Sequence, residues 1–320
     1  MKSASLAISA TSFLRAKLAI GGIGLITASV VSIPIAASAA DLYFSDFSNG
    51  TIGKITSLGA VSTFASGFNS PRGIAFDASG NLYVSDQSAA RNNSIKKITP
   101  SGNVSTFVSG LADPVFGLAF DASGNLFAAN YFADNIEKIT PSGNVSTFVS
   151  GLRRPYDLAF DASGNLFETD FDILSGARIN KITPLGNVTS NPGSALSAFT
   201  GLAVDSSGNA ALSDVGRNII IKFSTTTLAS TGSINGLSGD LAFDESGNLF
   251  VADSGRIEKI NTLGSVSTFA TTGNTPFSIA FAPTLSTPAA VPEPFTVVGT
   301  LIGGTAALRM RKKLRSTAKS

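Results

Sequence analysis

A repeated unit of about 40 residues constrains this chain more than any other feature of its sequence. The clearest copy spans residues 71–110 and reads PRGIAFDASGNLYVSDQSAARNNSIKKITPSGNVSTFVSG. Short runs rich in β-branched and aromatic residues alternate in it with turn sequences such as DASGN and PSGN. This pattern predicts two hairpins in tandem, which together form a four-stranded antiparallel sheet.

The first strand of the unit recurs six times along the chain. The copies are Ile74–Phe76, Leu118–Phe120, Leu158–Phe160, Leu202–Val204, Leu241–Phe243 and Ile279–Phe281. Alanine is the middle residue of every copy, as expected for strands that converge on an axis and leave room only for small side chains. The sequence therefore predicts an all-β fold, a six-bladed β-propeller of four-stranded antiparallel blades over residues 40–283.

The sixth copy is split between the two ends of this region. Its first strand is expected at residues 277–281, and its other three strands at residues 42–45, 51–56 and 61–65. Terminal sheets that stayed apart would expose unpaired edges. We therefore expect the last blade to be closed by one C-terminal and three N-terminal strands.

The run PRGIAFDASGNLYVSD in residues 71–86 resembles the NHL repeat. That repeat belongs to a wider group of six-bladed propellers, which includes the gluconolactonase and regucalcin-type enzymes. The resemblance covers residues 41–283 and implies the propeller fold. It implies no single activity, because this scaffold carries unrelated functions.

Residues 1–39 are typical of a secretory signal peptide. Basic residues precede an apolar run over residues 18–31, expected to be helical, and Ala37 and Ala39 form a small-x-small cleavage pattern. We expect export with cleavage near Ala39. An uncleaved membrane anchor is the alternative.

A second sorting segment spans residues 291–315, after a linker over residues 284–290 and before a tail over residues 316–320. It contains Pro292, Glu293 and Pro294, then an apolar run expected to form a short helix, and then basic residues. The segment resembles the PEP-CTERM signal of exported bacterial proteins. The resemblance implies handling by exosortase-type machinery, transient membrane contact through the terminal segments, and delivery to the cell envelope, cell surface or extracellular matrix. A simple membrane tail is the alternative.

The charge and composition of the propeller speak against several function classes. The whole chain has a net charge of +2, but residues 41–290 hold 14 lysines and arginines against 20 aspartates and glutamates, so this region carries −6. Nucleic acid is therefore not an expected partner. The sequence contains no cysteine and no histidine. Streptogramin lyases, another propeller family, depend on a catalytic histidine, so that activity is not expected here.

One carboxylate occupies a position that is apolar in most other copies. Glu168 stands where other blades have Phe44, Val84, Ala128, Leu212 and Val251. A carboxylate in such a place is costly unless it is paired or binds a metal. We expect a structural pair with an arginine, Arg153 and Arg154 being close in sequence. The alternative is a metal site formed by Glu168, Asp170 and Asn130, lined also by Asp157, for which Ca²⁺ is the most suitable ion; no other cofactor is expected.

Residues that differ between blades at the start of the inner strands are candidates for ligand binding. They are Arg72, Phe116, Tyr156 and Asp157, the last of which replaces a glycine found in other copies. Acceptors also end the second strand of every copy, as in Asp46 and Asp86. Because they recur in each blade, we expect them to order their loops by accepting backbone N–H groups.

Two functions remain open from the sequence. The first is an exported, non-enzymatic propeller that binds a glycan or a surface protein. The second is a metal-dependent lactonase or esterase of the gluconolactonase/regucalcin type, with Glu168 and Asp170 in its site.

Overall fold

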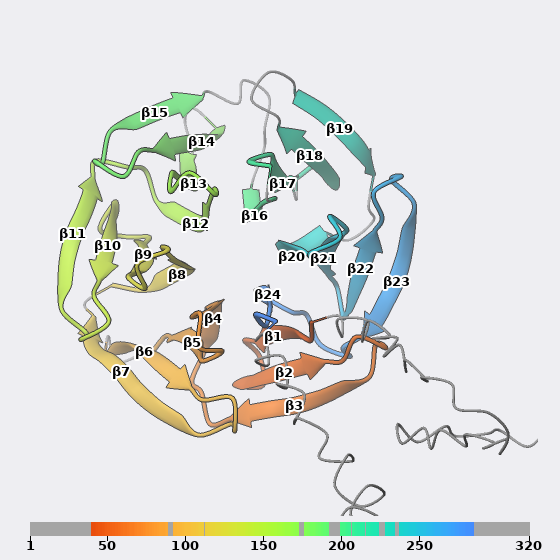
Figure 1. Ribbon diagram of the computed structural model, residues 1–320, viewed down its shortest axis with the longest axis horizontal. Coiled ribbons are helices and arrows are strands. Elements are labelled where there is room, and N and C mark those ends of the chain that lie inside the picture. The colour runs from red at the N-terminus through yellow and green to blue at the C-terminus, as the bar shows by residue number, and fades with distance from the viewer. Residues whose placement is uncertain are drawn as a thin grey trace, which may run out of the picture. The chain divides into compact units, whose positions relative to one another are not determined.

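The computed structural model describes residues 40–88, 92–111, 113–172, 176–191, 199–205, 207–214, 216–223, 228–233 and 237–284. These residues form six four-stranded antiparallel sheets arranged in a ring (Figure 1). The predicted all-β six-bladed propeller is confirmed. The signal segment, the sorting segment and the helices expected in them lie outside the described residues. In the part that the structure describes, no helix has the length and apolar character needed to cross a membrane.

Each blade runs from an inner strand at the axis to an outer strand at the rim. The inner strands are β4 (Pro71–Phe76), β8 (Val115–Phe120), β12 (Pro155–Phe160), β16 (Phe199–Val204), β20 (Leu237–Phe243) and β24 (Ile279–Phe281). The second strands are β1 (Leu42–Asp46), β5 (Leu82–Asp86), β9 (Leu126–Asn130), β13 (Leu166–Asp172), β17 (Ala210–Asp214) and β21 (Leu249–Asp253). The third strands are β2 (Thr51–Ile55), β6 (Asn93–Ile98), β10 (Asn135–Ile139), β14 (Gly176–Ile182), β18 (Ile219–Phe223) and β22 (Arg256–Ile260). The outer strands are β3 (Val61–Ser66), β7 (Val104–Leu111), β11 (Val145–Ser150), β15 (Val188–Asn191), β19 (Leu228–Ser233) and β23 (Val266–Thr271).

One sheet contains strands from both ends of the described region, in the order β24-β1-β2-β3. β24 is antiparallel to β1, with Leu42 opposite Phe281. Two further backbone hydrogen bonds extend this pairing: Ser45 N donates to Ser278 O (3.0 Å) and Phe277 N donates to Ser45 O (2.9 Å). The pairing therefore holds Phe277 and Ser278 beside the second strand of the sheet.

Aromatic rings on the second strands hold neighbouring blades together. Tyr83 of β5 makes edge-to-face contacts with Phe107 of its own outer strand and with Phe120 of the next inner strand, each with ring centroids 4.9 Å apart. Equivalent pairs of contacts centre on Tyr43, Phe127 and Phe250. Ala75 lies in the same buried cluster as Tyr83. A small residue in the inner strand therefore leaves space for a large ring in the second strand.

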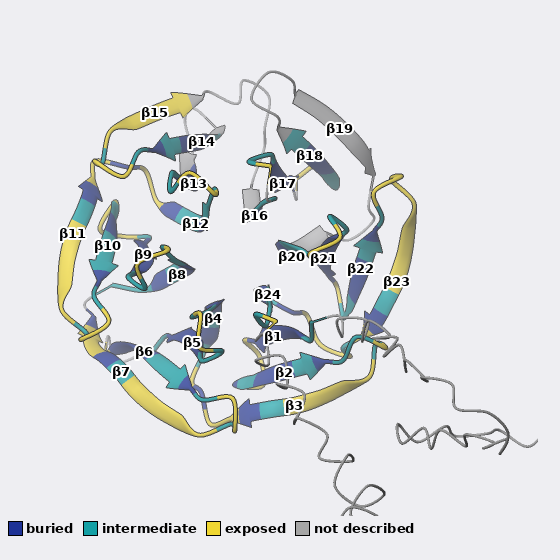
Figure 2. Ribbon diagram, viewed as in Figure 1, coloured by how far each residue is buried: buried dark blue, intermediate teal, exposed yellow. Residues whose placement is uncertain are grey.

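Burial is greatest in the second strands and least in the outer strands at the rim (Figure 2). The described second strands β1, β5, β9, β17 and β21 are buried along their whole length. The outer strands β3, β7, β11 and β23 begin with three exposed residues. Rigid positions for a functional site are therefore found near the axis, where inner strands of different blades approach one another.

Candidate functional site

Three of the predicted ligand-binding residues lie side by side at the start of neighbouring inner strands. Arg72, Phe116 and Tyr156 are each the second residue of their strand, in β4, β8 and β12. The guanidinium carbon of Arg72 lies 4.5 Å from the centre of the Phe116 ring, and the centroids of the Phe116 and Tyr156 rings are 5.0 Å apart. The structure thus brings them together, while their role in binding stays a prediction.

Four further aromatic residues complete this group, which we call the aromatic–arginine cluster. Phe47 and Phe277 lie 4.6 Å and 4.9 Å from the Arg72 guanidinium carbon. Tyr131 lies 4.7 Å from Phe116, and Phe132 lies 4.9 Å from Tyr131, as measured between ring centroids. The cluster therefore consists of Arg72, Phe47, Phe116, Tyr131, Phe132, Tyr156 and Phe277.

The repeat pattern does not identify these four aromatic residues, for two different reasons. Phe47, Tyr131 and Phe132 lie in turns after the second strands, where the repeat pattern carries no information. Phe277 could have been found, because it precedes Ser278 and Ile279 in the same way that Arg72 precedes Gly73 and Ile74.

The cluster combines exposed aromatic surface with a charge that is removed from water. Phe132 is 61% exposed and Phe47 38% exposed, whereas Arg72 and Tyr156 are half-buried. Desolvation lowers the pKa of Arg72 and raises the pKa of Tyr156 well above its usual range. Arg72 Nε is buried without a hydrogen-bond partner among the described residues. The cluster can therefore offer both stacking surfaces and hydrogen-bond donors to a ligand.

The next position along the inner strands forms a layer of carboxyl groups around the axis. Three blades have glycine here, because a neighbouring backbone leaves no space; a Cβ at Gly117 would lie 2.7 Å from Cα of Asp157. The other three blades have Asp157, Asp240 and Ser278. Asp157 was predicted as a site residue, whereas Asp240 and Ser278 were missed although they align with it in the repeat.

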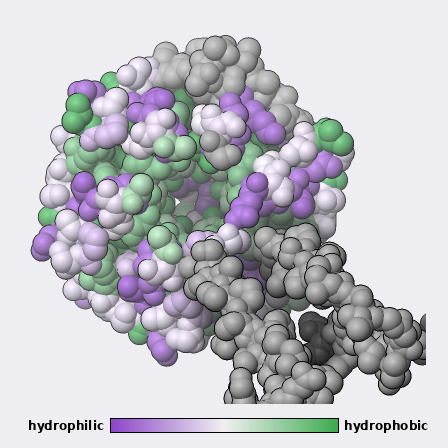
Figure 3. All heavy atoms as spheres, viewed as in Figure 1, coloured by the Kyte–Doolittle hydropathy of each residue, from purple (hydrophilic) through white to green (hydrophobic). Residues whose placement is uncertain are grey.

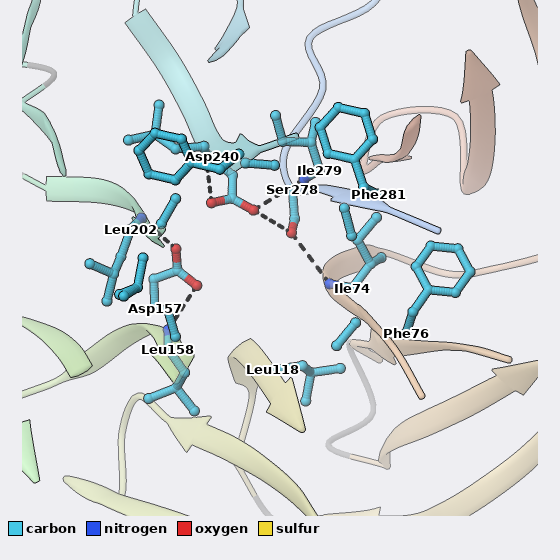
Figure 4. A pocket seen from close by; sticks show the side chains of 18 of the residues that line it. Ile74, Phe76, Leu118, Asp157, Leu158, Leu202, Asp240, Ser278, Ile279 and Phe281 are labelled. Carbon is cyan, nitrogen blue, oxygen red and sulfur yellow. Dashed lines mark hydrogen bonds between the residues drawn. The ribbon is translucent and has the colours of Figure 1, made fainter. Parts of the chain in front are cut away.

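These side chains hydrogen-bond to backbone groups of adjacent blades (Figure 4). Asp157 accepts the N–H groups of Leu158 (2.8 Å) and Leu202 (2.7 Å). Asp240 accepts those of Leu241 (2.7 Å) and Ile279 (3.1 Å). The Ser278 hydroxyl donates to Asp240 (2.7 Å) and accepts the N–H of Ile74 (3.3 Å). The carboxyl layer thereby fixes the inner strands to one another.

The carboxyl groups of Asp157 and Asp240 also interact electrostatically with each other. Burial raises the pKa of Asp157 well above its usual range, and it raises the pKa of Asp240 as well. Two adjacent carboxylates cannot both ionise without strong repulsion. We infer that the two carboxyl groups share a proton over a pH range in which isolated aspartates are already ionised.

A cavity of about 350 Å³ lies along the axis, beyond the carboxyl layer in the direction of the inner strands. Its walls are inner-strand residues such as Leu118, Phe243 and Phe281, and Asp157 and Asp240 border it. The face seen in Figure 3 is hollowed at its centre, where the blades meet. The cavity is largely apolar, and its only described carboxyl groups are already hydrogen-bonded.

Glu168 is fully buried, and its partner differs from the one expected. Asn180 donates from Nδ2 to Glu168 Oε2 (2.6 Å) and to Asp170 Oδ2 (3.1 Å). The arginine of this site is Arg178, which binds Asp170 through Nε (3.0 Å) and a terminal nitrogen (2.7 Å). The register between β13 and β14 explains why the partner is not an arginine, since β14 places Asn180 opposite Glu168 and Arg178 opposite Asp170. Burial raises the pKa of Glu168 to about 8.

The third residue of the predicted metal site lies in another blade. Asn130 ends β9, whereas Glu168 belongs to β13. Within the described ranges, no group of three or more acidic residues is arranged to hold a metal ion. A metal site that joins Asn130 to Glu168 and Asp170 stays a prediction.

Carboxylates at the ends of other second strands bind backbone N–H groups of nearby loops. Asp86 accepts the N–H groups of Asn69 (2.8 Å) and Ser70 (3.0 Å), and Asp46 accepts that of Asn49 (3.1 Å). These contacts favour the expected loop-ordering role.

Comparison with known proteins supports the fold. A family model described as the NHL repeat matches residues 68–98. No curated protein shows significant sequence similarity to the chain. Among solved structures, a gluconolactonase from Xanthomonas campestris is 17% identical with a TM-score of 0.59, over 76% of this chain and 89% of that one.

Two lyases have the same architecture. A streptogramin B lyase is 15% identical with a TM-score of 0.58, over 79% of this chain and 93% of that one. A catalytically inactive histidine-to-alanine variant of virginiamycin B lyase from Staphylococcus aureus, crystallised with quinupristin, is 14% identical with a TM-score of 0.56, over 78% of this chain and 94% of that one. At these identities, the similarity shows the fold alone.

The shared proton of the carboxyl layer predicts a characteristic pH dependence of stability. Because the pKa of Asp240 is higher in the folded state than in the unfolded state, its contribution is fully present below about pH 4 and is lost as pH rises through the raised pKa. Asp240→Asn should therefore flatten the decrease in unfolding free energy between pH 4 and pH 8, as measured by urea denaturation. The control Asp244→Asn changes a carboxylate in the turn between β20 and β21, and equal pH profiles for all three proteins would contradict the shared proton.

Because Glu168 and Asn180 contact each other, we predict that replacing both residues preserves the stability of the protein, whereas replacing one of them alone does not. In the next blade the equivalent positions are Leu212 and Ile221, which lie opposite each other. Asn180→Ile alone should destabilise the protein by about 3 kcal/mol, because it removes the partner of a buried polar group. The double variant Glu168→Leu/Asn180→Ile should be at least as stable as the native protein at pH 8, with a smaller gain at pH 4, since the pKa of Glu168 is raised from 4.5 to about 8.

Thermal unfolding with calcium or with a chelator completes this test. If the pair is structural, calcium should change the unfolding midpoint of neither protein. A midpoint that rises with calcium in the native protein alone would show instead that Glu168 is a metal ligand.

Proposed function

We propose that the protein is a non-enzymatic binding module of the bacterial cell surface or extracellular matrix. In this proposal the aromatic–arginine cluster holds a glycan or a segment of a surface protein. The observation that carries it is the exposed aromatic surface at two places in the cluster: Phe47 lies next to the half-buried Arg72, and Phe132 lies against Tyr131.

The chemistry of the cluster suits a sugar best. The C–H faces of a sugar ring are apolar and pack well on aromatic rings, and its hydroxyl groups need polar partners at the edges of such a site. Tyr131 and Tyr156 provide hydroxyl groups, and Arg72 provides N–H donors. The rings come from separate elements, namely β8, β12 and the turns at residues 47–50 and 131–134, so together they can contact more than one sugar unit.

The absence of histidine from the sequence supports a binding role over lyase chemistry. The virginiamycin B lyase variant described above is catalytically inactive after a histidine-to-alanine substitution, and the present sequence has no histidine. The carboxyl groups of Asp157 and Asp240 accept four backbone N–H groups and a serine hydroxyl. Such extensive hydrogen bonding favours a structural role for this layer.

We further propose that pairing of the two chain ends closes the ring and thereby completes the cluster. Support comes from the hydrogen bonds between Ser45 and the segment of Phe277 and Ser278. The Ser45 hydroxyl also donates to the carbonyl oxygen of Arg72 (2.6 Å). Ser45 thus connects the strand that carries Arg72 with the segment that carries Phe277, and both residues belong to the cluster.

The proposed location depends on segments outside the described residues. Export would use residues 1–39, with cleavage after the Ala37–Ala39 pattern, and sorting would use residues 291–315 and exosortase-type machinery. Support comes from the order of motif, apolar run and basic tail in the sequence.

A metal-dependent lactonase or esterase is the second candidate function. It is favoured by the similarity in fold to a gluconolactonase and by Glu168 Oε1, which is buried without a hydrogen-bond partner among the described residues. Glu168, Asp170 and Asn130 would then hold a divalent cation such as Ca²⁺. The calcium measurement on the Glu168→Leu/Asn180→Ile variant tests this candidate directly.

The glycan proposal predicts that one exposed ring contributes to affinity without contributing to the fold. Phe132→Ala should weaken binding to cell-surface polysaccharide of the source bacterium roughly tenfold, since a stacked aromatic ring contributes more than 1 kcal/mol in many binding sites. Affinity is measured with the full-length protein on immobilised polysaccharide, and unchanged thermal stability shows that the fold is intact. Leu185→Ala is the matched control, because Leu185 is 88% exposed in an outer turn. Equal losses in both variants, or no loss in either, would contradict the proposal.

The sorting proposal predicts that the motif acts separately from the propeller. Replacement of Pro292, Glu293 and Pro294 by alanine should leave the unprocessed protein in the membrane fraction, whereas the native protein is cleaved and reaches the cell surface. The linker variant Pro288→Ala is the control. Normal surface delivery of the triple variant, as judged by fractionation and immunoblotting, would contradict sorting through this motif.

A further inference from the structure

Arg72 differs from other arginines near the axis because its charge is not matched by a carboxylate. Arg178, Arg217 and Arg256 each form an ion pair with an aspartate in or at the end of a second strand, at 2.7 Å, 3.9 Å and 2.7 Å. Arg72 instead lies among the rings of Phe47, Phe116 and Phe277, and no described acidic side chain pairs with it. A half-buried charge in this situation favours an anion from outside the chain.

The guanidinium group is held in place before any ligand binds. Three rings lie within 4.9 Å of its central carbon, and the carbonyl oxygen of Arg72 accepts a hydrogen bond from Ser45 (2.6 Å). Phenylalanine rings stabilise the cation but accept no conventional hydrogen bond, so the N–H donors of Arg72 keep their capacity. A side chain fixed in this way loses little conformational entropy when it binds an acceptor.

The surroundings of Arg72 do not supply the missing negative charge. The carboxyl layer contains Asp157 and Asp240, whose oxygens accept backbone N–H groups of the inner strands, and neither carboxyl group forms an ion pair with Arg72. A second cation is close to the cluster, since the guanidinium carbon of Arg154 lies 5.8 Å from the centre of the Tyr131 ring. Two arginines therefore lie at the cluster, within a propeller whose net charge over residues 41–290 is negative.

From these observations we infer that the ligand is acidic: a glycan with carboxylate-bearing sugars of the uronic acid class, whose carboxylate Arg72 binds. A carboxylate matches the planar fork of a guanidinium group and can accept two parallel hydrogen bonds. The rings of Tyr131 and Phe132 then provide surface for the sugar units next to it. This inference rests on the proposed glycan-binding function and names the class of glycan.

Two oligosaccharides that differ only in charge test the inference. Calorimetry on the full-length protein compares an oligomer of uronic acid with the same oligomer after its carboxyl groups are reduced to alcohols. The acidic oligomer should bind roughly tenfold more tightly or better, because hydrogen bonds to charged groups contribute more than neutral ones. This difference should decrease as salt concentration rises.

Variants of Arg72 then assign the difference to one side chain. Arg72→Met should abolish the preference for the acidic oligomer, whereas Arg72→Lys should keep part of it, because lysine retains the charge without the fork. Thermal unfolding shows whether each variant is folded. The preference of the native protein between the two oligomers is measured without any variant.

The possible outcomes separate the two proposals. Equal affinity of the native protein for both oligomers would overturn the inference and leave the glycan-binding function standing, with Arg72 as a structural residue. Binding of neither oligomer would overturn the inference together with the proposed function. A preference for the acidic oligomer that survives in folded Arg72→Met would overturn the role given to Arg72.

Discussion

The close approach of six inner strands at one axis is the constraint on which the rest of the structure depends. At Gly73 a Cβ would lie only 1.9 Å from the carbonyl oxygen of Phe116, and at Gly201 it would lie 2.7 Å from Cα of Asp240. Where the position is not glycine, its side chain reaches the backbone of the next blade, as Asp157 does at Leu202. Crowding and hydrogen bonding at one layer thus join the blades into a ring.

This layer also determines where a ligand can bind. Directly before it in the inner strands lie Arg72, Phe116 and Tyr156, which point their large side chains toward one another because the layer below them is packed. Beyond it lies the axial cavity, bordered by the same two carboxyl groups. The layer therefore separates a surface that combines exposed aromatic rings with Arg72 from a cavity lined mainly by apolar side chains.

Much of the candidate site could be predicted from the repeat, because a difference between otherwise equal copies marks a position with a special environment. Arg72, Tyr156 and Asp157 were identified in this way, and Asp240 and Phe277 follow from the same alignment. The partner of Glu168 could not be predicted, since it depends on the register between β13 and β14. A shift of two residues would have paired Glu168 with Arg178 instead of Asn180.

The sequence by itself determined the architecture, since strand period, turn residues and the number of copies are local properties that repeat along the chain. It also determined which chemistry is missing, because histidine and cysteine do not occur in it. Only the tertiary structure decided which varying residues meet. Phe47, Phe116 and Phe277 are far apart in the chain, and they surround Arg72 because the strands on which they lie converge on one axis and because β24 pairs with β1.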